Sequence, residues 1–466
     1  MKDYSTISME NLTFSVKISN FFFLNKLFFK DCFAAKTGGI LQISEFVNVK
    51  IKHCEFRNGL SDFGAVFYIR DYAKVFIEDS KIYQNFGWTN LIDISDSIFF
   101  IKDTIFYENF NNIILLSGSN FSCINTSFLN HSCMLNSQGC ILSAFKESYI
   151  GISSNLFENI LSLSENNIYL LSSHAILQNI SFISVRTKKN KGNIIGSAQS
   201  YLSIINGFMS KYEGNALNLE ESNIEISDTK LLNNLFNKRG LSPVIIINCF
   251  YFRLIKVQFE NNSYSDQGGA ISMMNTLKMF FTQSEYIIMQ SNFSLNTATK
   301  GGAIYLKNQN LSIINSTFKS NEADYGGAIF CELDGIFCFI NIFKVFFFNF
   351  FVDTLHVQTI ISKNYFINNK ATIDGGGIKW AGFTPFFSEN YYDLNKAQYG
   401  NNIASYPIKM RLEIFENIQN SSKLIYSSNE NIILNLYEIN PGNKIQFHLV
   451  FSLLDIYEET VVTQKG

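Results

Sequence analysis

The sequence predicts an all-β chain that coils into a parallel β-helix of about 14 rungs. The first observation is a unit written twice between residues 293 and 329, in which Phe is followed by Asn and then by Gly-Gly-Ala-Ile, with copies that begin at Phe293 and Phe318. The second is that this spacing continues along most of the chain, and periods of roughly 20 to 50 residues are typical of stacked repeats. The third is that apolar residues alternate with period two in short runs, whereas helical periodicity is weak.

The repeat that begins at Gly302 can be divided into strands residue by residue. Residues 303–306, 311–313 and 317–319 are expected to be strands, and residues 307–310 are expected to turn. Three such short strands cannot bury an apolar face alone, but they can when rungs stack at about 4.8 Å. About 14 rungs would then form a rod near 65 Å long, at about 4.8 Å per rung.

Each rung is expected to carry one large anchor that points inward and stacks on the anchor of the next rung, which contributes roughly 0.5–1.5 kcal/mol per aromatic pair. Successive anchors are about one repeat apart, except for the step from Phe318 to Phe366, which is close to twice as long and which we interpret as two repeats with one anchor missing. The expected anchors are Phe29, Phe56, Tyr83, Phe106, Phe128, Phe157, Phe182, Phe208, Leu232, Phe259, Phe293, Phe318, Phe366 and Tyr392.

Asn and Gly are expected at the corners of the rungs. Asn accepts positive φ, and its side chain can hydrogen-bond as a ladder between rungs; glycine permits the sharpest turns. The corner asparagines are Asn58, Asn85, Asn109, Asn130, Asn159, Asn261, Asn296, Asn321, Asn368 and Asn395. The glycine turns begin at Gly38, Gly64, Gly268, Gly301, Gly326 and Gly375, with weaker copies at Gly192, Gly214 and Gly400.

The composition suits a core-forming protein rather than a disordered one, because 47% of the 466 residues are hydrophobic and 16% are charged. A net charge of −2 gives no electrostatic reason to expect nucleic acid or an anionic membrane as a partner. The first residues lack the apolar segment of a signal peptide. The repeat pattern begins in mid-rung, so the chain is expected to be a fragment or a truncated gene model. The apolar run 336–352 contains Asn341, Lys344 and Asn349, and no transmembrane helix is expected there.

The eight cysteines contain no C-x-x-C pair, so a zinc ribbon or a thioredoxin-type site is not expected. They are interpreted as small buried residues. The alternative is one or two disulfides, for example within the group Cys123, Cys133 and Cys140.

The paired G-G-A-[ILV] and F-x-x-N repeats resemble those of the chlamydial polymorphic outer-membrane proteins. They are also similar to repeats of large ciliate surface proteins, whose arrays end like residues 395–407. The resemblance spans roughly residues 20 to 407 and is weakest between 140 and 250, where the glycines are lost. It implies a right-handed, pectin-lyase-like β-helix and an extracellular or cell-surface location.

Two regions break the repeat. Residues 333–358 are rich in Phe and lack a glycine turn, and we interpret them as a degenerate rung with an insertion. After residue 407 the repeat stops, and residues 409–416, 431–439 and 444–457 alternate like strands. The expected domains are therefore a β-helix over 1–407 and an incomplete antiparallel β-sandwich-like segment over 408–466.

The sequence offers no clear catalytic, cofactor-binding or metal-binding residues. Asp93 and Asp96 form the closest acidic pair but are expected to mark a strand end, and Asp374 is expected in a turn. The group Glu220, Glu221, Glu225, Asp228 and Glu260 is the only one that we expect could meet across rungs. His53, His131, His174, His356 and His448 are dispersed without metal-ligand spacing, and the basic run 186–191 is expected to be a solvated loop.

Ten N-x-[ST] sequons permit glycosylation of a secreted protein but do not argue for it at this frequency. Their asparagines are Asn11, Asn120, Asn125, Asn130, Asn179, Asn261, Asn292, Asn310, Asn315 and Asn420.

Three function classes remain open. The leading hypothesis is a non-enzymatic cell-surface or secreted protein, part of a larger membrane-anchored one, whose rigid β-helix serves adhesion or recognition of a protein or glycan. It would need no cofactor, bind no nucleic acid and attach to a membrane only through other regions. The alternatives are a carbohydrate-active enzyme of the pectin-lyase-like class, which would need converging carboxylates, and a degenerate gene product.

Overall fold

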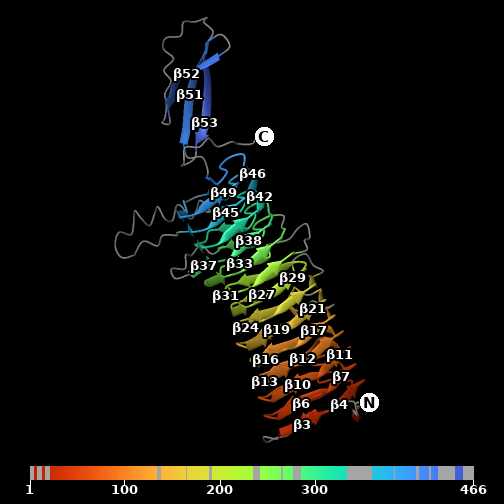
Figure 1. The fold of residues 1–466 in the computed structure, drawn as a ribbon. Coiled ribbons are helices and arrows are strands. Elements are labelled where there is room, and N and C mark those ends of the chain that lie inside the picture. Colours follow the sequence, from red (N-terminus) through yellow and green to blue (C-terminus); the bar gives the residue numbers. More distant parts are fainter. Residues whose placement is uncertain are drawn as a thin grey trace, which may run out of the picture.

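The computed structural model is an elongated stack of parallel strands (Figure 1). It describes residues 5–7, 13–15, 21–133, 138–163, 165–187, 192–234, 242–263, 266–276, 285–332, 359–381, 384–405, 409–418, 421–428 and 447–454. Each rung passes through three parallel sheets, named sheets 1, 2 and 3 in chain order. The predicted all-β parallel β-helix is confirmed.

Sheet 1 has 14 strands, most of them five residues long. They are β3 (Phe21–Asn25), β6 (Asn48–Lys52), β10 (Lys74–Glu78), β13 (Ile98–Lys102), β16 (Asn120–Ile124), β20 (Tyr149–Ser153), β24 (His174–Gln178), β28 (Tyr201–Ile205), β31 (Asn223–Ser227), β34 (Tyr251–Ile255), β37 (Glu285–Met289), β40 (Ser312–Ile314), β44 (Ile360–Ser362) and β48 (Phe386–Ser388). These make about 13 turns, which at about 4.8 Å each span about 62 Å.

Sheet 2 has 15 short strands and carries the inward anchors. They are β1 (Ser5–Ile7), β4 (Leu27–Lys30), β7 (Glu55–Arg57), β11 (Lys81–Tyr83), β14 (Ile105–Tyr107), β17 (Ser127–Leu129), β21 (Leu156–Glu158), β25 (Ser181–Ile183), β29 (Phe208–Ser210), β32 (Lys230–Leu232), β35 (Gln258–Glu260), β38 (Asn292–Ser294), β41 (Thr317–Lys319), β45 (Tyr365–Ile367) and β49 (Tyr391–Asp393).

Sheet 3 closes each rung after the glycine turn. Its consecutive strands are β2 (Thr13–Ser15), β5 (Leu41–Ser44), β9 (Phe67–Ile69), β12 (Phe86–Ser95), β15 (Phe110–Ser117), β19 (Gly139–Phe145), β23 (Asn166–Leu171), β27 (Asn193–Ala198), β30 (Asn215–Glu220), β33 (Val244–Ile247), β36 (Ile271–Met274), β39 (Ile304–Lys307), β43 (Ile329–Glu332), β47 (Ile378–Ala381) and β50 (Ile403–Ala404).

The segment between sheets 2 and 3, called the arm, also pairs from rung to rung. Its separate strands are β8 (Leu60–Ser61), β18 (Ser132–Cys133), β22 (Leu161–Ser162), β26 (Arg186–Thr187), β42 (Glu322–Tyr325) and β46 (Lys370–Asp374). After the β-helix, a three-stranded antiparallel sheet is formed by β51 (Lys409–Ile418), β52 (Ser421–Ser428) and β53 (Phe447–Leu454). The sequence did not predict β52, and the strand expected over 431–439 lies outside the described residues.

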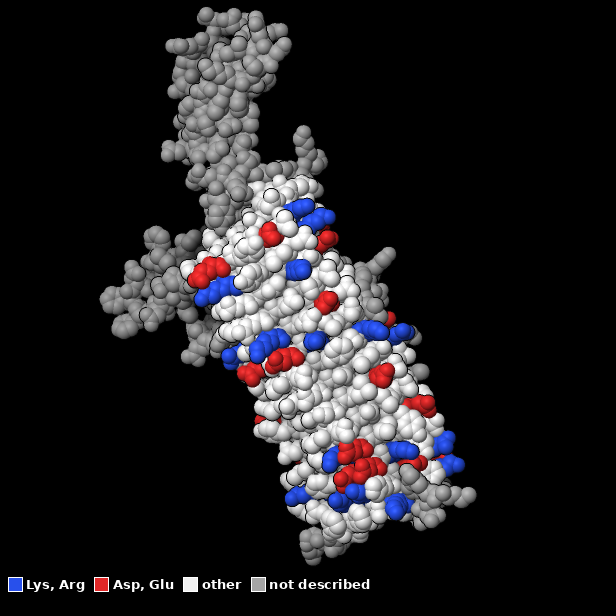
Figure 2. Space-filling view, viewed as in Figure 1, with Lys and Arg blue, Asp and Glu red and all other residues white. Residues whose placement is uncertain are grey.

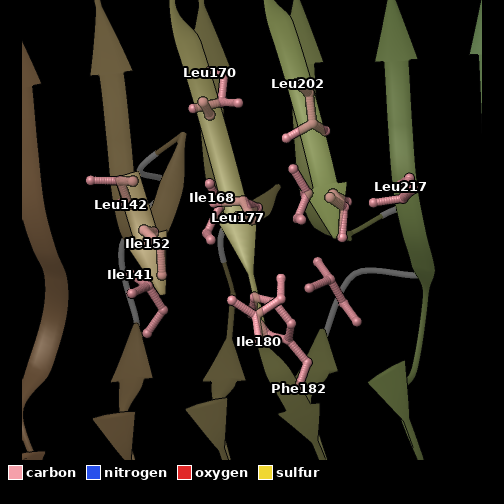
Figure 3. Close-up of a cluster of buried hydrophobic side chains, with 14 of the residues drawn as sticks. Ile141, Leu142, Ile152, Ile168, Leu170, Leu177, Ile180, Phe182, Leu202 and Leu217 are labelled. Atoms are coloured by element: carbon pink, nitrogen blue, oxygen red, sulfur yellow. The ribbon is translucent and has the colours of Figure 1, made fainter. Parts of the chain in front are cut away.

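The core fills the space between the three sheets. Equivalent side chains of the rungs form a row, as Leu142, Ile168 and, two rungs further, Leu217 do in Figure 3. The anchors stack as expected: the rings of Phe293 and Phe318 are parallel to within 3°, with centroids 4.8 Å apart. The column of inward anchors is therefore a continuous apolar contact from rung to rung within the core.

Three expected anchors are wrong by one residue. The inward residues are Ile82, Met209 and Leu231, all fully buried, rather than the neighbouring Tyr83, Phe208 and Leu232. In a strand, neighbouring side chains point to opposite faces, so a slip of one residue reverses the face. Spacing alone does not separate a large side chain on the outer face from one on the inner face.

The long step from Phe318 to Phe366 is a single rung rather than two. The two residues pair directly between β41 and β45, and their rings stack 4.9 Å apart. Residues 333–358 lie outside the described residues, but the strands on both sides of them belong to consecutive rungs. The expected extra rung between these two anchors is therefore wrong, and the expected insertion lies outside the described residues.

The corner asparagines perform two separate roles at adjacent positions. The residue two after each anchor has positive φ and is mostly exposed, such as Asn368 at +52°. The next residue is buried and forms the ladder. Its longest run is Asn262, Asn296, Asn321, Asn369 and Asn395, whose amides donate to the next side-chain oxygen at 3.0 Å. The sequence interpretation merged the two positions into one.

The glycine pair likewise serves two purposes. Gly301 has a φ of +64°, which side chains with a Cβ rarely adopt, whereas a Cβ on Gly302 would lie 2.1 Å from the carbonyl oxygen of Gly327 in the next rung. Cys140 occupies the position of Gly302 in an earlier rung, since the pairing from β19 to β39 places Leu142 and Ile304 in one column. There a disulfide from Cys140 to Cys133 closes the arm.

The disulfide confirms the alternative interpretation for two of the cysteines. Five others are free and buried, as the first interpretation expected: Cys32, Cys54, Cys123, Cys249 and Cys331. Cys338 lies outside the described residues. Within the described part of the chain, no helix is long and apolar enough to cross a membrane.

Candidate recognition surface

The expected acidic pair is separated by the fold. Asp96 lies just after β12 at a φ of +49°, as expected for a strand end. Asp93 lies within β12 and is buried, which corrects that expectation. Its carboxylate accepts hydrogen bonds from Arg70, at 2.5 Å, and from Asn90. Burial raises the pKa of Asp93, and the Arg70 guanidinium opposes this shift.

Asp374 is also buried in a strand, β46, rather than placed in a turn. Its Oδ2 lies 2.9 Å from Nζ of Lys379, which also donates to the carbonyl oxygen of Ser405 at 2.9 Å. Burial raises the pKa of Asp374, and Lys379 acts against that rise. Both buried aspartates are thus paired with a cation. The Arg70–Asp93 pair links consecutive rungs at sheet 3, and the Asp374–Lys379 pair links the arm strand β46 to β47.

The other expected candidates do not converge. Glu220 ends β30 in sheet 3, Glu221 and Asp228 occupy two corners, Glu225 lies on the outer face of sheet 1, and Glu260 belongs to sheet 2. Two tyrosine hydroxyls, at 3.1 and 3.0 Å, already donate to Glu225. The described residues contain no group of three or more His, Cys, Asp or Glu that could hold a metal ion.

One histidine is part of the ladder. His131 is buried at the ladder position, and its Nδ1 accepts a hydrogen bond from the main-chain N–H of Asn109 at 3.3 Å. Burial lowers the pKa of His131 to about 4. The other histidines are His53 at a corner, His174 on the outer face of sheet 1, His448 in β53, and His356, which lies outside the described residues. In the basic run, Arg186 and Thr187 form β26 and residues 188–191 are not described.

The feature that the sequence interpretation missed is an exposed aromatic surface on the arm of the first rungs. We call it the aromatic ridge, and it consists of Phe33, Leu60, Phe63, Phe86, Trp88 and Phe110. The exposed fractions are 48% for Phe33, 44% for Phe63, 55% for Trp88 and 40% for Phe110. Contiguous exposed apolar patches on a protein surface are typical of interaction sites.

The main-chain pairing fixes the spacing of the ridge. Phe33 pairs with Leu60, Leu60 with Phe86, and Phe86 with Phe110, so each rung contributes one large apolar side chain to a single column. Trp88 lies two residues after Phe86 on the same side of the arm. Its indole meets the Phe86 ring edge to face, with centroids 5.2 Å apart.

The fold does not require apolar residues in this column. The column is the position directly after the ladder, and in later rungs it holds Ser263, Thr297, Glu322, Lys370 and Lys396. Those rungs pair in the same way with polar or charged side chains. The aromatic residues of the first rungs are therefore explained by something other than the β-helix itself. The signal that could have found them is an aromatic residue directly after the ladder position.

Comparison with known proteins agrees with the predicted repeats. Residues 290–307 and 315–332 match the Chlamydia polymorphic membrane protein repeat. No curated protein matches the chain by sequence. The likeness to ciliate surface proteins stays an expectation.

Two solved β-helix structures are distantly similar. One is a tailspike protein mutant of the E. coli bacteriophage HK620 in complex with a pentasaccharide, with 11% identity, a TM-score of 0.32, and coverage of 90% of this chain and 76% of that chain. The other is a PL6 alginate lyase in complex with a trisaccharide, with 10% identity, a TM-score of 0.29, and coverage of 89% and 87%. The chain is thus a parallel β-helix that carries repeats of the polymorphic membrane protein type.

Proposed function

We propose that this chain is a non-enzymatic recognition protein, displayed on the cell surface or secreted as part of a larger membrane-anchored protein, which binds a partner through the aromatic ridge. The observation that carries the proposal is the column of Phe and Leu side chains, with exposed Trp88 beside it, at a position that is polar or charged in most later rungs. The match to a membrane-protein repeat supports the surface location. Rung-to-rung ladders make the rod a rigid support, and a rigid site loses less entropy on binding.

The chemistry of the ridge favours the apolar surface of another protein as its partner. Of its six side chains only Trp88 carries a hydrogen-bond donor, so the ridge offers little to the hydroxyl groups of a sugar. Exposed Trp and Phe are the side chains that dominate protein interfaces, and truncation of a central one costs about 2 kcal/mol or more. That corresponds to roughly 30-fold in Kd. Adhesion to a surface protein would follow from this chemistry.

The test titrates the labelled full chain onto intact cells of its source. Trp88→Ala and Phe86→Glu should each weaken binding at least about tenfold, while thermal unfolding stays near that of the unmodified chain, since Glu322 occupies the same column elsewhere. Leu161→Glu is the matched control, because Leu161 is exposed in this column one rung beyond Ser132, outside the ridge. Equal binding by all three variants would refute the role of the ridge.

Treatment of the cells separates the partner classes. If protease abolishes binding and glycosidases do not, the partner is a protein, as proposed. The reverse result would move the proposal to a glycan partner.

We also expect no polysaccharide lyase activity. Lyase chemistry needs a base beside the proton that is removed and a cation to stabilise the resulting charge. In the described residues the buried aspartates are paired with Arg70 and Lys379, and the remaining candidate carboxylates lie on different sheets and corners. Purified chain incubated with polygalacturonate, with and without calcium, should release no unsaturated uronate. Release that is lost in Glu225→Gln would overturn the non-enzymatic proposal.

A further inference from the structure

The sequons divide by exposure in the folded chain. Of the eight whose asparagine is described, Asn310 is partly exposed and the other seven are exposed: Asn120, Asn125, Asn130, Asn179, Asn261, Asn292 and Asn315. None of the buried asparagines in the described residues begins a sequon. Strand alternation contributes to this division, because residues two apart share a face. What matters is that an attached glycan at these seven positions would meet solvent rather than the core.

Four of these asparagines border one uncharged surface, which we call the uncharged flank. It is the outer face of β16, β20, β24 and β28 in sheet 1 and of β17, β21, β25 and β29 in sheet 2. Glu158 is the single acidic or basic residue in these eight strands, apart from His174. In Figure 2 the flank lies in the pale band between the charged side chains of the first rungs and those of later rungs.

The flank combines this lack of charge with exposed apolar side chains. Tyr149 is 59% exposed, Ile176 43% and Ile205 37%. Uncharged surfaces with exposed apolar groups promote self-association of soluble proteins. In the earlier rungs, charged side chains on the same face of sheet 1 oppose self-association. Examples are Lys50, Lys52 and Glu78. Where a surface protein lacks such charges, another group must shield the exposed apolar side chains from self-association.

We propose that the uncharged flank is covered by N-linked glycans on Asn120, Asn125, Asn130 and Asn179. Asn120 and Asn125 lie at the two ends of β16, Asn130 follows β17, and Asn179 follows β24. Asn125, Asn130 and Asn179 occupy exposed corners with positive φ, and each makes one side-chain hydrogen bond to a corner of a neighbouring rung. The inference rests on the proposed surface location, because the modification takes place in the secretory pathway.

The reaction is a glycosyl transfer from a lipid-linked oligosaccharide diphosphate. The amide nitrogen of the asparagine side chain bonds to C1 of the first sugar, the bond from C1 to the diphosphate oxygen breaks, and the amide loses one proton. The lipid diphosphate leaves with the electron pair of the broken bond. No oxidant or reductant is required.

The test expresses the full chain behind a secretion signal in eukaryotic cells and maps its glycopeptides by mass spectrometry. Asn125 and Asn179 should be occupied. Ser127→Ala should abolish the modification of Asn125 without altering its side chain, which donates a hydrogen bond to Asp103. Ser184→Ala is the control, because Ser184 has the same type of corner on the flank but belongs to no sequon.

A second measurement tests the covering role. Enzymatic removal of the glycans should convert a monomer into larger species in sedimentation, and Ile176→Lys with Ile205→Lys should restore the monomer. Secreted protein that is unmodified at the four asparagines would overturn the inference, as would deglycosylated protein that stays monomeric. Neither result affects the proposed function, which depends on Trp88 and Phe86 in earlier rungs and is measured by partner binding.

Discussion

The buried histidine of the ladder should make the stability of the rod depend on pH. His131 is neutral when folded because burial lowers its pKa from 6.5 to about 4, while the main-chain groups of Asn109 and Phe106 oppose the shift. The unfolded chain binds a proton below about pH 6.5 that the folded chain binds only near pH 4. Folding stability is therefore fully present above pH 6.5 and falls as the pH drops toward 4. A shift of this size corresponds to about 3 kcal/mol.

The measurement compares urea unfolding of the natural chain and His131→Asn between pH 7.5 and pH 4. Asn occupies the ladder position in the two preceding rungs, as Asn85 and Asn109, so the variant should extend the ladder and differ little at pH 7.5. At pH 4 it should be about 3 kcal/mol more stable relative to the natural chain than at pH 7.5. Other titrating groups are common to both proteins and cancel. A difference in unfolding free energy that does not change with pH would refute the argument.

Three further predictions concern single interactions that stabilise the β-helix. Phe318→Ala should lower the unfolding free energy by roughly 3–5 kcal/mol in urea, because a fully buried ring in the anchor column is removed; a change near zero would contradict the inward register. Lys379→Met should cost roughly 3–5 kcal/mol by leaving the Asp374 carboxylate buried without a cation, and adding Asp374→Asn should recover part of the loss. Reduction of the Cys133–Cys140 disulfide should lower stability by about 2.5 kcal/mol for a loop of this size, and reductant should not affect Cys133→Ala.

The fold could be predicted from the sequence because each repeat combines residue types that a stacked rung requires at fixed positions. Gly301 and Gly302 are required by a turn and by a close approach between rungs, and Phe318 by the core. The turn, the close approach and the core position recur in each rung, so the spacing of these residues can be recognised in the sequence. Where two residues of similar kind are adjacent, as at Ile82 and Tyr83, the pattern could not tell the inner face from the outer one, because burial depends on register rather than composition.

The long step between the anchors Phe318 and Phe366 shows a different limit of prediction from sequence. The spacing between Phe318 and Phe366 is close to two repeats, so the spacing of the anchors predicted an additional rung that lacks an anchor. Only the direct pairing of β41 with β45 shows that the two anchors belong to consecutive rungs.

The candidate surface could not be found from motifs, because its residues have no catalytic chemistry and lie on separate rungs, far apart in the sequence. What identifies it is a comparison within the chain: one structural column holds Phe33, Phe86 and Phe110 in the first rungs and Glu322 and Lys370 in later ones. A repeat protein supplies its own control for each position, since the same backbone environment recurs with different side chains. Residue types that the fold requires recur at the same position in successive rungs. A residue that differs from this type without disturbing the strand pairing can instead serve recognition. By this reasoning, substitution of ridge residues by Thr or Glu should leave the β-helix folded and abolish only the binding of its partner.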